Sequence, residues 1–118
     1  MQRKAPKLLH DIRQAADAIQ QWTASRTFEQ YRDDAMLRAA VERKFEIIGE
    51  ALNRLAHLDP NTAERLGPYK QIVAFRNILI HGYDIIEHER VWHVIANELP
   101  TLLAQAEQLL QEVEADNE

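Results

Sequence analysis

The stretch Arg76-Asn77-Ile78-Leu79-Ile80-His81-Gly82-Tyr83 carries the strongest structural signal in this chain. From position 72 to position 83, Arg, Asn and His are the only charged or amide-bearing side chains in an otherwise apolar segment. We expect a helix that is buried on most of its faces, where an arginine is rare unless it is paired or used in function. At 3.6 residues per turn, Asn77 and His81 lie on one face, and Arg76 is next to Asn77. A cation, an amide and an imidazole held on one rigid element suit a phosphate group better than a hydrophobic core.

Helical periodicity extends outward from this stretch in both directions. Apolar residues recur at spacings of three and four in three further segments, which predicts amphipathic helices. These stripes are Leu8, Ile12, Ala15, Ile19 and Trp22; then Leu37, Val41, Phe45, Ile48, Leu52 and Leu55; and finally Trp92, Ile95, Leu99, Leu102, Ala106, Leu109 and Val113. The aromatic residues Trp22, Phe45 and Trp92 lie on the stripes and are expected in the core rather than in a base-stacking platform. Pro100 should kink the last helix, because its ring clashes with the carbonyl of Ala96.

Start and stop signals divide the chain into helices joined by short connections. Pro6 fits just ahead of the first helix, Thr27 and Gln30 form a potential capping box, and Asp33 or Asp34 can cap the second long helix. Asp59-Pro60 and Gly67-Pro68 bracket a short turn, after which the helix around Arg76 runs from about Tyr69 to His81 and ends at Gly82. We therefore predict an all-α, antiparallel up-and-down bundle with three long helices and short ones. It forms a single domain over 1–118, with a core over about 7–110 and an acidic tail that frays past Glu112.

Composition excludes several classes of function. A chain of 118 residues without cysteine has room for one domain and offers neither disulfides nor a thiolate zinc site. Neither a membrane-spanning run nor a signal peptide is evident, so a cytoplasmic protein is expected. The four histidines outside the opening stretch show no paired metal-ligand spacing, so no metal site is expected: His10, His57, His88 and His93. A net charge of −5 argues against nucleic-acid binding by bulk charge, although it allows a local basic cleft.

The opening stretch resembles the R-x(4)-H-x-Y signature of the HEPN superfamily, in its HepT-type toxin branch. The segment Ala40-Val41-Glu42-Arg43-Lys44-Phe45-Glu46-Ile47-Ile48-Gly49-Glu50-Ala51-Leu52 is also similar to the helix that leads to I-I-G-E-A in that branch. Downstream, Asp84, Val91-Trp92 and Leu99-Pro100 follow the same pattern. The resemblance extends from about Leu8 to about Leu110, nearly the whole chain.

This resemblance implies a homodimer whose two motif helices line one cleft. It also implies a metal-independent ribonuclease toxin of a type II toxin–antitoxin pair, with RNA as substrate and no cofactor of its own. Arg76, Asn77 and His81 would be the catalytic residues. The partner would be an MNT-type nucleotidyltransferase antitoxin that uses ATP to adenylylate Tyr83. The alternative is a non-catalytic HEPN module that binds a nucleotide or a nucleotidyltransferase partner.

Elementary chemistry gives these residues suitable roles without the family. RNA can be cleaved without a metal when its own 2′-hydroxyl attacks the adjacent phosphorus, and His81 is the candidate base. The guanidinium of Arg76 would face the developing charge, and Asn77 would orient His81 or donate to a phosphate oxygen. In a dimer, two copies of His81 can divide the base and acid roles. Supporting cations are available at Arg38, Arg43, Lys44, Arg54, Arg3, Lys4 and Lys7.

Each of these residues also has a purely structural interpretation. Arg76 can pair with Glu50, which interrupts an apolar helix face as well, and such a pair can also orient an arginine that binds phosphate. His81 can interact with the helix dipole, and Tyr83 can cover the helix end. Gly49 is expected at a close approach of two helices rather than in catalysis.

Overall fold

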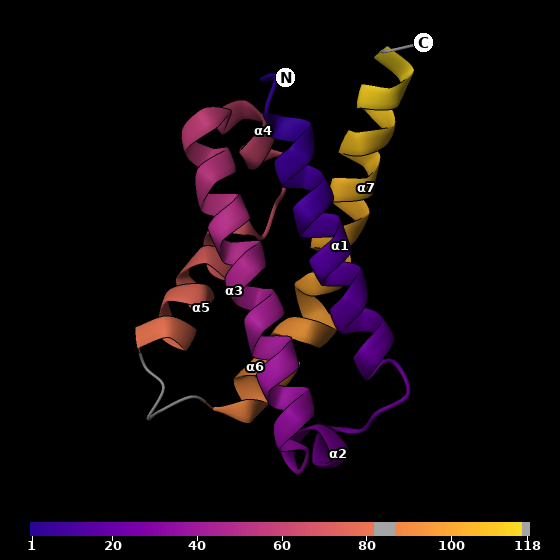
Figure 1. Cartoon of the computed structure of the whole chain (residues 1–118), viewed down its shortest axis with the longest axis vertical. Helices are drawn as coiled ribbons and strands as arrows, with labels where there is room; N and C mark the ends of the chain where they lie inside the picture. The colour runs from indigo at the N-terminus through magenta and orange to yellow at the C-terminus, as the bar shows by residue number, and fades with distance from the viewer. Residues whose placement is uncertain (82–86, 117–118) are drawn as a thin grey trace.

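The computed structural model describes residues 1–81 and 87–116, and these ranges contain helices but no strand. The helices are α1 (Ala5–Thr23), α2 (Phe28–Arg32), α3 (Ala35–Leu58), α4 (Pro60–Glu64), α5 (Tyr69–His81), α6 (His88–Asn97) and α7 (Leu99–Asp116). Figure 1 shows α1 running antiparallel to both α3 and α7, with α5 beside α3. The predicted all-α, up-and-down bundle of three long helices with shorter ones is confirmed.

Side-chain caps set the starts of three helices. Thr27 and Gln30 form the predicted capping box at α2, and the carboxylate of Asp34 accepts the N–H of Leu37 at the start of α3. Asp59 caps α4 in the same way through the N–H of Thr62. Each cap satisfies a backbone donor that the first helical turn leaves unpaired.

Helix α3 forms the centre of the hydrophobic core. Its predicted stripe is buried throughout, and five of its members have no exposed surface: Val41, Phe45, Ile48, Leu52 and Leu55. Helix α1 covers one side of this stripe and α5 covers another. The Phe75 ring of α5 meets the Phe45 ring edge-on, with 5.1 Å between the ring centroids.

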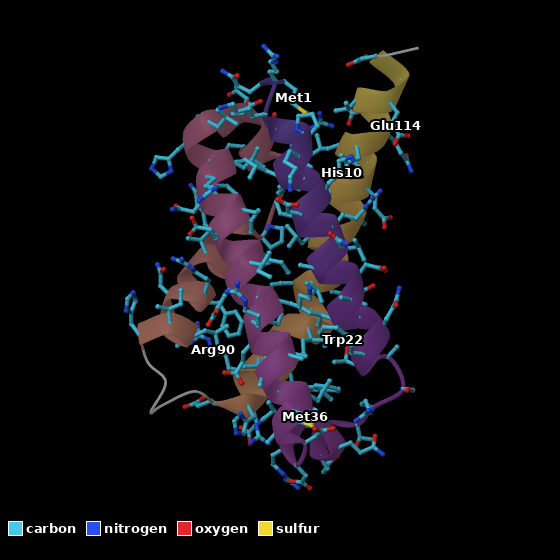
Figure 2. All side chains as sticks on the ribbon, in the orientation of Figure 1. Met1, His10, Trp22, Met36, Arg90 and Glu114 are labelled. Atoms are coloured by element: carbon cyan, nitrogen blue, oxygen red, sulfur yellow. The ribbon has the colours of Figure 1, made fainter. Side chains whose placement is uncertain are left out.

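The buried face of α1 differs at its ends from the predicted stripe. Leu9 and Thr23 are buried in place of Leu8 and Trp22, and Trp22 is 38% exposed near the lower end of α1 (Figure 2). Thr23 can be buried because its hydroxyl donates to the carbonyl of Ile19 at 2.8 Å. The prediction that Trp22 belongs to the core is wrong, whereas Phe45 is fully buried and Trp92 is partly buried. Because Leu8 and Leu9 are adjacent and both apolar, the sequence does not decide which of them begins the buried stripe.

Pro100 separates two helices instead of kinking one. Helix α6 ends at Asn97 and α7 begins at Leu99, so Pro100 lies in the first turn of α7, where its missing N–H is tolerated. Helix α7 continues to Asp116, so the prediction of fraying past Glu112 is wrong within the described residues. None of the described helices is both long and apolar enough to cross a lipid bilayer.

Candidate functional site

Helix α5 carries the candidate catalytic residues, and its bounds match the prediction of Tyr69 to His81. Its buried face consists of Ile72, Phe75 and Leu79, which pack toward α3. The expectation of burial on most faces is wrong, because Asn77 and His81 are exposed and the Arg76 side chain is 23% exposed. Nothing in the described part of a single chain covers the outer face of this helix.

Arg76 is held in place through two of its nitrogen atoms. Its Nη2 donates to Glu50 Oε2 at 2.9 Å, and its Nη1 donates to Asn77 Oδ1 at 3.2 Å. The predicted contact with Glu50 is therefore confirmed, although Glu50 is 44% exposed and is not a buried carboxylate. The Nε atom of Arg76 is buried and has no hydrogen-bond partner among the described residues. The guanidinium thus has a fixed position with donor capacity left over.

Glu50 also binds a second guanidinium. Its Oε1 accepts from Arg54 Nε at 3.0 Å, one helical turn further along α3. One carboxylate therefore lies between the cations of Arg54 and Arg76, and the three groups carry a net positive charge. A phosphate oxygen near this group would meet two guanidinium forks held by one anion.

The backbone of α3 passes very close to Arg76 at Gly49. A Cβ atom added at Gly49 would overlap the Cβ and Cγ atoms of Arg76. Glycine is therefore required at this crossing, as predicted from its place between the helices. The absence of a side chain at position 49 lets α5 bring Arg76 against α3 and within reach of Glu50.

A cavity of about 320 Å³, here called the site cavity, lies next to Arg76 between α1, α3 and α5. Its charged lining residues are Asp11, Arg43, Glu46, Glu50, Arg54 and Arg76. Three cations thus face three carboxylates, and Arg43 contacts Glu46 at 3.3 Å. Asn77 and His81 do not line this cavity, so the described part of one chain does not bring all three motif side chains to one hollow.

The candidate supporting cations lie in different places in the structure. Arg43 and Arg54 line the site cavity. Two others are engaged elsewhere: the Lys44 ammonium lies 5.9 Å from the centroid of the Trp22 ring, and Arg38 donates to the backbone carbonyl of Arg32. The three cations at the amino end, Arg3, Lys4 and Lys7, line a separate cavity.

Sequence reasoning named Glu50 and Arg54 but missed Glu42 and Glu46, which continue the same polar ridge along α3 at intervals of four residues. This spacing places all four side chains on one face, which is the signal that could have identified them. Desolvation raises the pKa of Glu42, and the nearby His88 and Arg38 partly oppose this rise. Burial likewise raises the pKa of Tyr31, whose hydroxyl has no partner among the described residues.

Tyr83, with Gly82, lies outside the described residues, so its position as a modification site stays a prediction. Within 1–81 and 87–116, no group of three or more potential His, Asp or Glu ligands could hold a metal ion.

Comparison with known proteins places this geometry in context. Residues 12–109 match the family model described as "Ribonuclease HepT-like". The "Probable ribonuclease HepT" of Thermococcus cleftensis is 31% identical over 112 residues, which cover 92% of this chain and 98% of that protein. The "Putative RNase MJ0127" of Methanocaldococcus jannaschii is 30% identical over 110 residues, which cover 93% of this chain and 90% of that protein. A search of solved structures found no match.

Proposed function

Since the chain belongs to the HepT-like ribonuclease family of the HEPN superfamily, we propose that it is a metal-independent endoribonuclease that acts as a toxin. The observation that carries the proposal is the fixed guanidinium of Arg76, with Asn77 bound to it and His81 exposed at the end of the same helix. These side chains supply positive charge, a hydrogen-bonding amide and an imidazole that can accept or donate a proton.

The proposed reaction needs these side chains, the RNA and a proton donor for the leaving oxygen. His81 accepts the proton of the 2′-hydroxyl, and the freed oxygen bonds to the adjacent phosphorus. Arg76 faces the charge that develops on the phosphate oxygens, where a fixed donor is most effective. The bond from phosphorus to the 5′-oxygen then breaks, and that oxygen takes up a proton from a second copy of His81 or from water. The products are a 2′,3′-cyclic phosphate and a 5′-hydroxyl end.

A homodimer would complete the site. The outer face of α5 exposes Ala74, Asn77 and His81, and half-buried apolar side chains flank it at Val73 and Ile80. A second copy packed around a two-fold axis near this face would cover the apolar side chains. It would also bring a second His81 to protonate the leaving 5′-oxygen.

The proposed partner is an MNT-type nucleotidyltransferase antitoxin that transfers AMP from ATP to Tyr83. The sequence places Tyr83 two residues after His81, so an AMP group there would carry its phosphate toward the end of α5. Such a phosphate can pair with a guanidinium and would compete with RNA for Arg76. Modification would then inhibit cleavage without unfolding the bundle.

Cleavage of bulk RNA in the presence of EDTA tests the enzymatic proposal. We expect the wild-type chain to cleave RNA and to leave DNA of the same sequence intact, and His81→Ala should reduce the rate by at least about a hundred-fold. His10→Ala is the matched control, because His10 is an exposed histidine on α1. Cleavage that EDTA abolishes and magnesium restores would refute the metal-free reaction. No cleavage under either condition would favour the non-catalytic HEPN module.

A further inference from the structure

A cavity of about 800 Å³ lies apart from the motif helix α5. Its lining residues come from the start of α1 and the last two turns of α3, which lie side by side at the upper end of the bundle (Figure 1). We call it the amino-terminal cavity. Its charged and ionisable lining residues are Arg3, Lys4, Lys7, Arg54 and His57.

The charge of this cavity is one-sided. No carboxylate is among its lining residues, whereas the site cavity has three. Lys7 and Arg54 have carboxylate partners, Asp11 at 2.6 Å and Glu50 at 3.0 Å. Within the described residues, neither Arg3 nor Lys4 has one. A chain with a net charge of −5 therefore has a local basic hollow.

The cations at the amino end belong to an anchored segment. The N–H of Gln2 donates to Asp59 Oδ2 at 2.7 Å, and this hydrogen bond is the main cause that lowers the pKa of Asp59. On the other side of the cations, Ala5 is fully buried. Arg3 and Lys4 are thus held from both sides against the end of α3, and less freedom remains to be lost when they bind an anion.

The amino-terminal cavity adjoins the site cavity. Leu8 and Arg54 line both of them. Along α3, seven residues separate Glu50 beside Arg76 from His57, which corresponds to about 10 Å at the helical rise per residue. A chain that leaves the site cavity past Arg54 would enter the amino-terminal cavity next.

We propose that the amino-terminal cavity binds backbone phosphates of single-stranded RNA on one side of the bond that is cleaved. The proposal rests on the proposed ribonuclease function and gives its substrate a path. A groove of cations that follows the backbone is how proteins bind single strands. No Phe, Tyr or Trp lines this cavity, so phosphate contacts should contribute affinity here without reading sequence.

The test removes the three cations at the amino end together, as Arg3→Gln, Lys4→Gln and Lys7→Gln. All three side chains are exposed, so the bundle should fold normally. The control variant carries Arg13→Gln, Arg26→Gln and Arg32→Gln, which removes the same charge outside both cavities, from one half-buried and two exposed positions. Both sets are made in a His81→Ala background, so that binding is measured without cleavage.

Fluorescence anisotropy with a labelled single-stranded RNA gives the affinity at several salt concentrations. We expect the first variant to bind at least about ten-fold more weakly at 0.1 M salt, and its slope of log affinity against log salt to fall by about 2, since each lost phosphate contact removes about 0.7. The control should stay within about two-fold of the parent. With His81 restored, the loss should appear in KM, while kcat changes by less than about two-fold.

Equal RNA binding by the two triple variants would overturn the proposal, and so would a loss confined to binding of the nucleotidyltransferase. In both cases, RNA cleavage by the wild type would leave the proposed function standing. If the wild type neither binds nor cleaves RNA, the proposed function fails first and this inference fails with it.

Discussion

The contact between Arg76 and Glu50 joins two helices and also orients the guanidinium that is proposed to bind phosphate. The Arg76–Glu50 hydrogen bond of 2.9 Å joins α5 to α3. Because both side chains are partly exposed, the pair should contribute little to the free energy of unfolding. Its larger effect is to fix the direction of the guanidinium, since an arginine that is already ordered loses less freedom when it binds a phosphate.

Gly49 makes this arrangement depend on a single missing methyl group. In Gly49→Ala the added Cβ would overlap the Cβ and Cγ of Arg76, so we expect the free energy of unfolding to fall by about 1–3 kcal/mol and RNA cleavage to weaken as Arg76 shifts. Gly67→Ala is the control, because a Cβ there would meet the Gln105 side chain at an ordinary 3.5 Å. Urea denaturation compares the two variants, and equal stabilities would contradict the close approach.

Tyr83 allows a test of control that is independent of cleavage. Tyr83→Phe should cleave RNA as the wild type does, yet escape neutralisation when the antitoxin and ATP are added, because the hydroxyl that would accept AMP is absent. Tyr69→Phe is the control, since its hydroxyl contacts Glu64 at the other end of α5. Residual cleavage after incubation with antitoxin and ATP is the readout. Full neutralisation of Tyr83→Phe would favour occlusion by the bound partner instead.

At the level of helices, sequence predicted most of what the structure contains. The bounds of α5 were predictable because Gly67-Pro68 stops the preceding turn and the apolar density of the segment favours a helix. The buried face of α1 was not predictable, because Leu8 and Leu9 are equally apolar. Only the packing of the bundle determines that Leu9 is the buried one. The Arg76–Glu50 contact was predictable, because each of these opposite charges interrupts an apolar helix face. The amino-terminal cavity was not predictable, since it depends on how α1 and α3 pack against each other.

Asp59 connects α4 to the amino end and gives a prediction for these elements. Its carboxylate accepts from Thr62 and from the N–H of Gln2, and these hydrogen bonds lower its pKa. Because the folded chain favours the charged form, the stabilisation is present above the ordinary aspartate pKa and is lost as the pH falls through the lowered value. Asp59→Ala should therefore reduce the free energy of unfolding at pH 7 by about 1–2 kcal/mol.

The difference between wild type and Asp59→Ala should shrink as the pH falls below about 4. Urea denaturation at pH 7 and at acidic pH measures it. Asp17→Ala is the control, because Asp17 is exposed and its side chain accepts a hydrogen bond from Gln21 one turn further along α1. A difference that is independent of pH would show that the charge of Asp59 does not stabilise the fold.

Over the whole molecule, charge is distributed unevenly. The chain has a net charge of −5, but the amino-terminal cavity is lined by cations and the site cavity by equal numbers of both signs. If RNA is the substrate, the cations of the amino-terminal cavity would attract it locally despite the net negative charge. The positions of the charges are therefore a better guide to the chemistry of the binding partner than the net charge is.

The proposed dimer can be tested at the same scale through Ala74. This residue is exposed on α5, and Ala74, Asn77 and His81 follow at spacings of three and four, so they share one face. If a two-fold axis passes near this face, Ala74→Glu brings two new carboxylates close together, and the dissociation constant of the dimer should rise by at least about ten-fold. Light scattering at micromolar concentration should then detect monomers, and cleavage should fall because the second His81 is lost. Ala96→Glu, on the exposed face of α6, adds the same charge and should leave the dimer intact. A dimer that tolerates Ala74→Glu as well as Ala96→Glu would place the interface elsewhere and would remove the shared His81 pair from the proposed mechanism.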